Sequence, residues 1–484
     1  MNLNPNHMKY FKPYILLCIL ILTTFTNCKK FVELDAPKTL LVTKNVFASD
    51  ETAIAQLTGI YSQMSDREFM PYRLPFCTGI GGDELINHSA LFTNAYENSL
   101  QAVDAVTNAI WTAGYNYIYE ANAIYEGCAA STTLSPAVKK QLMAEALFIR
   151  AFWHFYLVNL YGDVPLATTT DYLVNSTLAR SAKDLVYQQI ITDLKNAQAG
   201  LNENYVGSNS IATTTDRVRP NKMTATALLA RVYLFNKNYS DAEAQATVVI
   251  NSKPNYDLVD VTKVFLKNSN ETIWALMKPT PANSINTWEG NYFILTSAPK
   301  TSFQNSAEIT PTLLSAFDDG DKRKINWIGK FTDMGVTPNV DYYYPFKYKV
   351  LTSASVSEYS LVFRVAEQYL IRAEARVQLG NLAGGINDTD AIRNRAGIAL
   401  IKDINPGIGK TDLLNVILKE RQKELFTEWG HRWIDLKRTG NIDAAMNAIA
   451  ASKGTVWNSN QQLWPIPQKE ILNDKNLAQN PGYN

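Results

Sequence analysis

The sequence contains 484 residues, of which 46% are hydrophobic and 19% charged, and its formal net charge is +1. This composition is that of a folded globular chain, long enough for one large domain or two to three ordinary ones. The near-neutral balance excludes the strongly basic surface of a nucleic-acid-binding protein, so no nucleic-acid partner is predicted.

The N-terminal segment has the pattern of an export signal. Lys9 and Lys12 precede an apolar run over residues 14–22, and small and polar residues follow up to Cys28. The run is too short for a comfortable transmembrane helix and fits the apolar region of a secretory signal. A cysteine directly after such a run resembles a bacterial lipoprotein signal. We therefore predict a signal peptide over residues 1–27 and lipidation of Cys28; the alternative is a chance cysteine near an ordinary cleavage site.

Few residues of the mature chain could build a disulfide framework or a metal centre. Besides Cys28 only Cys77 and Cys128 remain, which could form one bond or stay as two buried thiols. The remaining histidines are too few for a multi-histidine metal site and leave few candidates for a catalytic triad: His88, His154 and His431.

Residues 142–166 show the clearest helical pattern. Apolar residues recur there at three- and four-residue steps, and phenylalanines cover another side, which predicts a helix buried among others. Gly162 and Pro165 predict its end. Residues 116–128 are expected to form a helix that pairs with it.

Two stretches share a local signature. Residues 221–250 and 366–397 both contain Ala-Arg-Val-x-Leu, then a short polar turn, then a second helical run. This is typical of a tetratricopeptide-type helix pair, which cannot bury its faces alone and must stack on neighbours. Further helices are predicted over residues 184–199 and 411–428. The predicted fold class is therefore mainly α, a tetratricopeptide-like solenoid scaffold of helix pairs.

Residues 279–358 interrupt the helical pattern. They are rich in Pro, Gly, Asn, Ser, Thr and aromatic residues and show no helical period, which predicts irregular loops with short strands. So long an insertion between helical units is usually functional rather than scaffold.

The stretch ELFTEWGHRWIDLKRTG, residues 424–440, raises the question of an active site. His431 and Asp435 would share one face of a helix, and Glu428 with Asp435 could be proposed as the carboxylate pair of a glycosidase. Gly430 interrupts the helix, however, and no third metal ligand lies nearby. Alternating charges at helical spacing instead predict a structural framework of ion pairs: Arg421, Glu424, Glu428 and Arg432.

Several blocks in a fixed order resemble a known family. They are FVELDAPKT after Cys28, LTGIYSQM, GGDEL, AEALFIRAFWHFYLVNLYGDVPL, TATALLARVYLF, VAEQYLIRAEAR, NRAG, ERQKELFTEWGHRWIDLKRTG and LWPIPQKEILNDKNLAQNPGY. Together they resemble the SusD/RagB family of outer-membrane nutrient-binding lipoproteins of Bacteroidetes-type bacteria, over nearly the whole mature chain. The resemblance implies one compact domain with an N-terminal helical part (28–278), a ligand-binding insertion (279–358) and a C-terminal helical part (359–484). The two prolines of LWPIPQ predict an extended segment packed across the helices.

The resemblance implies binding rather than catalysis. Members of the family capture oligosaccharides, or in some branches peptides or other nutrients, and act as the lid of a SusC-like TonB-dependent barrel in the outer membrane. For this chain it implies a lipid-anchored protein that faces the exterior. No nucleophile elbow, phosphate loop or zinc-protease motif is present. The alternatives are a peptide ligand, and an adaptor that binds only protein through its helix pairs.

Aromatic side chains in the irregular regions are the candidates for stacking on the apolar faces of sugar rings. The stronger candidates are Trp288, Tyr292, Trp327, Tyr342, Tyr343 and Tyr344, and the weaker ones are Phe92 and Tyr96. For each, the alternative is a ring that packs its own loop. Trp153 and Trp274 lie in apolar runs and are expected to be structural.

The turn DDGDKRK holds three carboxylates, Asp318, Asp319 and Asp321. It resembles the start of a calcium loop but lacks the later bidentate glutamate. We expect a solvated acidic turn in preference to structural calcium, and no other cofactor is predicted.

Overall fold

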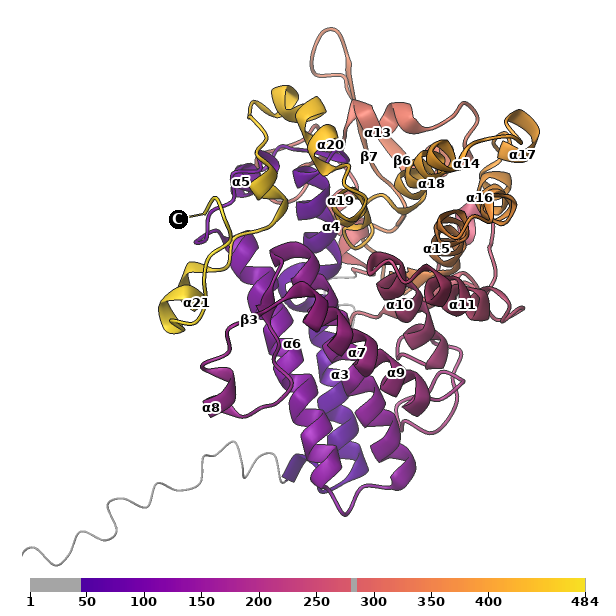
Figure 1. The fold of residues 1–484 in the computed structure, drawn as a ribbon. Helices are drawn as coiled ribbons and strands as arrows, with labels where there is room; N and C mark the ends of the chain where they lie inside the picture. The colour runs from indigo at the N-terminus through magenta and orange to yellow at the C-terminus, as the bar shows by residue number, and fades with distance from the viewer. Residues whose placement is uncertain (1–44, 280–284, 484) are drawn as a thin grey trace, which may run out of the picture.

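The computed structural model describes residues 45–279 and 285–483, and it is mainly helical (Figure 1). The predicted signal peptide and Cys28 lie outside the described residues. Within the described ranges no helix is both long enough and apolar enough to cross a lipid bilayer.

The long helices form a chain of packed neighbours, as predicted for a stack of helix pairs. Each packs on the next in the order α6, α7, α9, α10, α11 and α15, and α15 then packs on both α16 and α18, while α3 packs on α6 and α7. The bounds are α3 Asp50–Asp66, α6 Ala105–Ala130, α7 Pro136–Tyr161, α9 Lys183–Gly200, α10 Lys222–Phe235, α11 Tyr239–Ile250, α15 Val365–Gln378, α16 Leu382–Ala396 and α18 Lys410–Leu425.

Helix α7 is the central element of the core. It is buried on nearly all sides, with Trp153 and the predicted phenylalanines inaccessible to solvent. It ends as predicted, because Gly162 adopts φ +77°, a left-handed conformation that favours glycine, and Pro165 then lies in a short strand. The predicted pairing of the helix at 116–128 with this helix is confirmed by the packing of α6 on α7.

The predicted insertion is looped out of the helical stack. Helix α11 packs directly on α15, although the chain between them runs through the insertion. Strands β4 (Thr272–Leu276) and β8 (Ser360–Arg364) pair antiparallel and close its base. The irregular loops and short strands expected there are present, together with three six-residue helices too short to show a period in sequence: α12 Trp288–Phe293, α13 Pro311–Ala316 and α14 Lys322–Trp327.

Within the described residues, the remaining strands form three further antiparallel pairs. β1 (Leu85–Asn87) pairs with β5 (Ala307–Ile309), β2 (Val164–Pro165) with β3 (Arg180–Ser181), and β6 (Ile328–Asp333) with β7 (Val340–Pro345). The short helices not yet named are α4 Met70–Gly81, α5 Thr93–Tyr96, α8 Tyr172–Asn175, α17 Ile401–Ile404, α19 His431–Arg438, α20 Ile442–Ile449 and α21 Gln468–Asn473. The 3₁₀ turns are η2 Arg67–Phe69, η3 Ala90–Phe92, η4 Val261–Lys263, η6 Ala450–Lys453 and η7 Ser459–Gln462.

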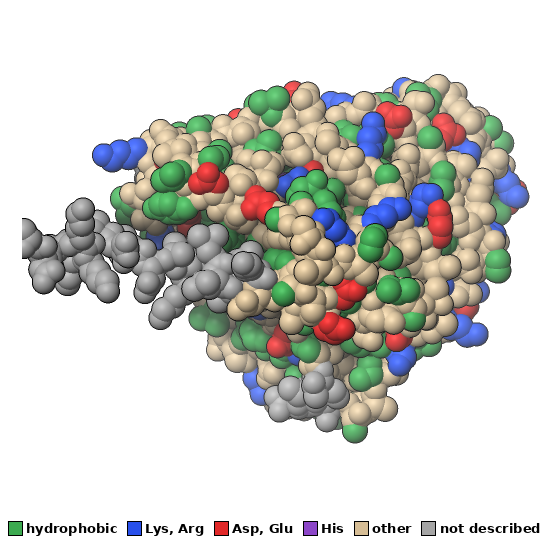
Figure 2. Space-filling model, turned by 90° about the horizontal axis from the view of Figure 1, so that it is seen from below, with side chains coloured by type: hydrophobic (Ala, Val, Ile, Leu, Met, Phe, Trp, Pro, Cys, Tyr) green, Lys and Arg blue, Asp and Glu red, His purple; other side chains and the backbone are tan. Residues whose placement is uncertain are grey.

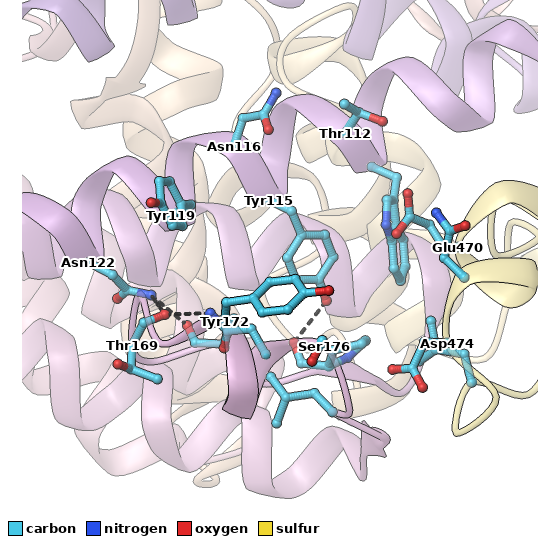
Figure 3. A pocket seen from close by; sticks show the side chains of 17 residues that line it. Thr112, Tyr115, Asn116, Tyr119, Asn122, Thr169, Tyr172, Ser176, Glu470 and Asp474 are labelled. Carbon is cyan, nitrogen blue, oxygen red and sulfur yellow. Dashed lines mark hydrogen bonds between the residues drawn. The ribbon is translucent and has the colours of Figure 1, made fainter. Parts of the chain in front are cut away.

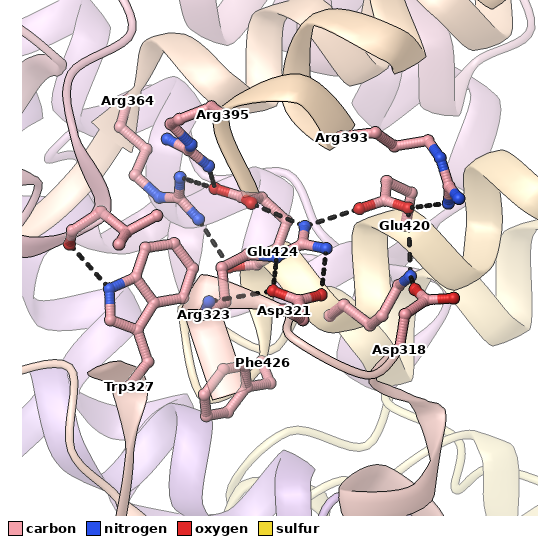
Figure 4. A network of polar contacts seen from close by, with 12 residues as sticks. Asp318, Asp321, Arg323, Trp327, Arg364, Arg393, Arg395, Glu420, Glu424 and Phe426 are labelled. Atoms are coloured by element: carbon pink, nitrogen blue, oxygen red, sulfur yellow. Dashed lines mark hydrogen bonds and ion pairs between the residues drawn. The ribbon is translucent and has the colours of Figure 1, made fainter. Parts of the chain in front are cut away.

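A buried charge network ties the insertion to the helical stack (Figure 4). Glu424 on α18 lies at its centre and contacts Arg323 at 3.0 Å, Arg364 at 2.5 Å and also Arg395. The term buried charge network denotes five carboxylates and five cations that are joined by ion pairs: Glu271, Asp321, Glu420, Glu424, Glu428, Arg323, Lys347, Arg364, Arg393 and Arg395.

The framework interpretation of residues 424–440 is supported, but the predicted pairing is wrong. The charges do not pair mainly along their own helix. Glu428 pairs with Arg364 at 2.8 Å, and Arg432 pairs with Asp83 of the GGDEL block at 2.6 Å. Helical spacing in sequence cannot show this, because the partners come from distant segments brought together by the fold.

The two carboxylates proposed for a glycosidase are both committed to ion pairs. Glu428 is held by Arg364 and Lys347, and Asp435 by Arg421 at 2.7 Å and Arg438 at 2.7 Å. Burial acts to raise the pKa of each carboxyl, but the neighbouring cations outweigh it and lower both pKa values. Neither carboxyl is therefore arranged to donate a proton at neutral pH.

The acidic turn is not wholly solvated, which corrects that part of the prediction. Asp321 is fully buried and pairs with Arg323 at 2.8 Å, while Asp318 pairs with Lys423 at 2.6 Å. Asp319 is exposed. Two of the three carboxylates thus face cations, and the described residues bring no three His, Cys, Asp or Glu side chains together for a metal ion.

Three other expectations are settled by the fold. Cys77 and Cys128 are free and buried, so the pair does not form a disulfide. The segment at residues 463–468 packs against the C-terminal end of α7, since the Trp464 amide donates to the Leu160 carbonyl at 2.9 Å. Trp274 is buried with its indole N–H donated to the Val218 carbonyl at 3.2 Å, as expected of a structural residue.

Removal of the central carboxylate should destabilise the protein strongly. We expect Glu424→Ala to lower the free energy of unfolding by about 3–5 kcal/mol, because it leaves buried guanidinium groups without their partner. Urea unfolding followed by circular dichroism measures the change. As a matched control, Glu203→Ala breaks the exposed pair with Lys222 and should cost less than about 1 kcal/mol. Equal effects of the two substitutions would contradict the proposed importance of the network.

Acid should weaken the same network. Burial opposes ionisation of Glu424, but the guanidinium groups around it hold its pKa well below the ordinary value of 4.5. The folded state therefore binds fewer protons than the unfolded state, and this stabilisation is full above pH 4.5 and is lost as the pH falls towards the lowered pKa. The urea concentration at the unfolding midpoint, measured from pH 7 to pH 3, should decrease once the pH is below 4.5. In Glu424→Gln this decrease should be smaller.

Candidate functional site

The insertion meets the N-terminal half of the chain along a short strand pair. Leu85 of β1 lies opposite Ile309 of β5, and Asn87 lies opposite Ala307. The Thr310 hydroxyl adds a hydrogen bond of 2.6 Å to the Asp83 carbonyl. Because Asp83 is also held by Arg432, this junction is fixed to the framework described above.

A cluster of aromatic rings fills the junction. Phe69 contacts Trp288 with ring centroids 4.6 Å apart and Phe303 at 5.9 Å. Tyr292 contacts Phe303 at 4.6 Å, and Phe303 contacts Phe92 at 5.4 Å. We call the rings of this region and their polar neighbours the loop junction: Asp66, Phe69, His88, Phe92, Tyr96, Lys278, Trp288, Tyr292, Phe303, Glu308 and Tyr342.

Trp288 is the half-buried member of the cluster with the most polar surroundings. Its indole N–H donates to Asp66 Oδ1 at 3.2 Å, and the Lys278 ammonium lies 3.9 Å from its ring centroid. Lys278 also pairs with Asp66. One aromatic ring, one acceptor and one donor therefore lie together, which are the groups that a sugar ring and its hydroxyls require.

Phe69 joins the cluster in a strained conformation. Its φ is +52°, which lies in the left-handed region where residues other than glycine are uncommon. It is the last residue of η2 and the N-cap residue of α4, and its ring contacts Trp288 and Tyr292 of the insertion. Strain of this kind persists only where surrounding packing enforces it, and such residues concentrate at ligand sites.

A second polar edge of the junction surrounds His88. His88 Nε2 lies 2.9 Å from Glu308 Oε2, and its ring meets the Tyr342 ring at 6.5 Å, edge to face. Burial and then the nearby Glu308 carboxylate raise the pKa of Tyr96. Two predicted tyrosines from distant parts of the chain therefore flank one acid–imidazole pair.

The structure places the predicted aromatic residues in different surroundings. Trp288, Tyr96 and Tyr342 are half-buried members of the junction. Tyr292 and Phe92 belong to the same junction but are only 7% and 4% exposed, so they form its floor. Tyr343 is half-buried and packs against the main core. It lies on one face of β7, and Tyr342 lies on the other.

Trp327 and Tyr344 do not belong to the candidate surface, which corrects the prediction for both. Trp327 is 1% exposed, donates its indole N–H to the Val261 carbonyl at 2.9 Å and lies beneath the cations of the buried charge network. Tyr344 is 9% exposed and packs over Gly329, where a Cβ would lie 2.3 Å from the tyrosine ring. Each ring is used for packing.

Sequence reasoning missed Asp66, Phe69 and Lys278. Phe69 and Asp66 stand in the run SDREF, directly after a helical block, and Lys278 immediately precedes the insertion. A charged and aromatic run at a helix end beside a functional loop is a usable signal, but nothing in the sequence shows that the two segments meet.

Two family models divide the chain between them. A model described as starch-binding and associating with the outer membrane matches residues 30–234, and the SusD family model matches residues 236–483. Among curated relatives, SusD-like protein P2 of Formosa agariphila is 25% identical over 98% of this chain and 100% of its own length. The starch-binding protein SusD of Bacteroides thetaiotaomicron is 32% identical, over 25% of this chain and 21% of its own.

Solved structures share the fold. A SusD homologue from Bacteroides thetaiotaomicron superposes with a TM-score of 0.79 at 21% identity, covering 92% of this chain and 99% of its own. A laminarin-binding SusD-like protein has a TM-score of 0.71 at 22% identity and covers 89% of this chain and 99% of its own. Since the SusD family model alone spans more than half of the sequence, the chain belongs to the SusD family.

Proposed function

We propose that this protein captures oligosaccharides at the cell surface and passes them to a SusC-like TonB-dependent barrel, acting as its lid without catalysing a reaction. The single observation that carries the proposal is the loop junction, where half-buried rings from the N-terminal half and from the insertion lie beside acids, a lysine and a histidine. Aromatic faces with nearby donors and acceptors suit a sugar better than an apolar or a highly charged ligand.

Two further observations support a saccharide ligand. The family model over residues 30–234 is described as starch-binding, and one structural neighbour is a laminarin-binding protein. On the face shown in Figure 2, basic, acidic and apolar side chains are interspersed, with no broad patch of one sign. A surface of this kind favours an uncharged ligand over a polyanion such as nucleic acid.

A peptide ligand is the second candidate. It is favoured only by the charged groups of the junction, since Asp66 and the His88–Glu308 pair could bind an amine or amide groups. Membrane attachment through a lipid on Cys28 completes the proposal and rests on the sequence before residue 45. Exposure at the outer face rests on the family resemblance alone.

Binding should depend on the half-buried rings of the junction. Calorimetry of a soluble form, residues 29–484, with neutral malto-, laminari-, cello-, xylo- and manno-oligosaccharides should detect micromolar to millimolar affinity for one class. Trp288→Ala and Tyr342→Ala should each weaken it by about tenfold, the loss expected for one stacking ring. Trp288→Phe should lose less, because it keeps a ring but not the bond to Asp66.

Tyr239→Ala, on α11 and outside the junction, serves as the matched control and should bind normally. Chromatography of the ligand after incubation should show no product. If all five saccharide classes fail to bind while peptides do, the saccharide proposal is wrong and the peptide alternative stands.

Membrane attachment and partner binding should both require Cys28. We expect the full-length protein, made in its own bacterium, to partition with the outer membrane and to copurify with a large barrel protein after mild crosslinking. Cys28→Ser should leave the membrane fraction and lose the barrel, while the isolated soluble form should keep its saccharide affinity. A Cys28→Ser protein that stays in the membrane with the barrel would exclude the lipid anchor.

A further inference from the structure

A groove lies apart from the loop junction, between α6, the segment at residues 165–178 and the C-terminal segment around α21 (Figure 3). Its cavity volume is about 600 Å³, within the range of sites that hold small organic ligands. None of the aromatic residues predicted from sequence lines it. The groove is therefore a separate feature of the surface and calls for its own explanation.

Aromatic rings line the groove from two sides. Trp111, Tyr115 and Tyr119 follow one another at four-residue steps on α6, which places them on one face of the helix about 6 Å apart along its axis. Tyr172 of α8 lies on the other side. Tyr119 is 51% and Tyr172 77% exposed, so each presents a ring to solvent that the fold does not need for packing.

The inner rings form a firm floor. Trp111 is only 3% exposed and contacts Tyr115 at 4.8 Å with the planes tilted by 48°. The Tyr115 hydroxyl donates to the Pro165 carbonyl at 2.8 Å, a bond that Figure 3 shows beneath Tyr172. Because these rings cannot rotate freely, a ligand would meet a surface already ordered for stacking.

The polar lining is uncharged or acidic. Thr112, Asn116, Ser176 and Asn473 supply hydroxyls and amides, and Glu470 and Asp474 of the C-terminal segment supply carboxylates (Figure 3). The described residues that line the groove include no lysine, arginine or histidine. Glu470 is half-buried, and this burial raises the pKa of its carboxyl against the opposing effect of Lys469.

Hydrogen bonds hold both of the non-helical sides of the groove in place. Asn122 on α6 donates to the carbonyls of Ala167 and Thr169, each at 3.2 Å, and Glu126 accepts from the Thr170 amide at 3.0 Å. The C-terminal segment is held in turn, since the Asn476 amide side chain donates to the Thr177 carbonyl at 3.0 Å. The groove is therefore preformed.

We propose that this groove is a second saccharide site, which takes an uncharged glycan chain and rejects anionic ones. Stacking rings spaced along α6 fit successive sugar units, hydroxyls and amides bind ligand hydroxyls, and the two carboxylates accept hydrogen bonds from them. Lys469 acts on Glu470 from outside the lining, but no cation lines the groove itself, so the two carboxylates repel uronates, sulfated sugars and acidic peptides. The ligand class rests on the proposed function, but the site does not share its residues.

Oxidative footprinting of tyrosines tests the two sites in one experiment. Residues 29–484 are exposed to hydroxyl radicals with and without neutral hexaoses of five backbones, and with a hexagalacturonate. Tyr119 and Tyr172 report the groove, Tyr342 the junction, and Tyr239 serves as the internal control. A neutral hexaose should slow oxidation of Tyr119 and Tyr172 by about threefold or more, because a ligand buried in the groove also shields the rings that line it from solvent. The hexagalacturonate should not.

Variants separate this proposal from the preceding one. Protection of Tyr119 and Tyr172 should persist in Trp288→Ala, whose junction is damaged. Tyr119→Ala should abolish protection of Tyr172, whereas Tyr119→Phe should keep it. Changing Glu470→Gln and Asp474→Asn together should improve hexagalacturonate binding by about tenfold, because the repulsion is removed.

Three outcomes would overturn the second site: no neutral hexaose protects Tyr119 or Tyr172, the hexagalacturonate protects them equally well, or protection disappears in Trp288→Ala. Protection of Tyr119 and Tyr172 without any effect on Tyr342 would instead support the groove and count against the loop junction as the capture site.

Discussion

The position of the insertion depends on the buried charge network. Carboxylates such as Glu424 and guanidinium groups such as that of Arg364 have left water together, and no isolated member could remain charged at that depth. An arrangement of this kind is formed completely or not at all, because each missing partner leaves an unpaired buried charge. It therefore fixes the orientation of α14, β8 and α18 relative to one another more strictly than apolar packing would.

The candidate capture surface inherits its rigidity from this framework. Arg432, in the block that supplies Glu424 and Glu428, also holds Asp83, and the Asp83 carbonyl accepts from Thr310 at the start of α13. The β1–β5 strand pair, along which the two halves of the loop junction meet, is thus anchored by a buried ion pair. Loops supported in this way can present a ligand surface without losing affinity to their own ordering.

The helical scaffold could be predicted because its signals are local. The apolar period of α7, the stop at Gly162 and the repeated Ala-Arg-Val-x-Leu turn each depend on neighbours within a few residues. The use of the aromatic residues depends on contacts between distant segments instead. Trp288 and Trp327 both lie in irregular stretches of the sequence. In the fold, however, Trp288 is half-buried at a surface, whereas Trp327 lies under buried cations. The charged residues of α18 likewise have the spacing for ion pairs along the helix, but most of their ion pairs are with residues of other segments.

The groove escaped prediction for a related reason. Trp111, Tyr115 and Tyr119 recur every four residues, which is also the pattern of a core-facing stripe, and Trp111 is indeed buried. The end of this stripe becomes one side of a groove because a second wall comes from the far end of the chain. Asn480 donates to the Tyr161 carbonyl at 2.8 Å, and Arg180 donates to the Ala478 carbonyl at 2.9 Å. The groove can therefore exist only when the whole chain has folded, so that a ligand bound there stabilises the contact between the first helices and the C-terminal segment.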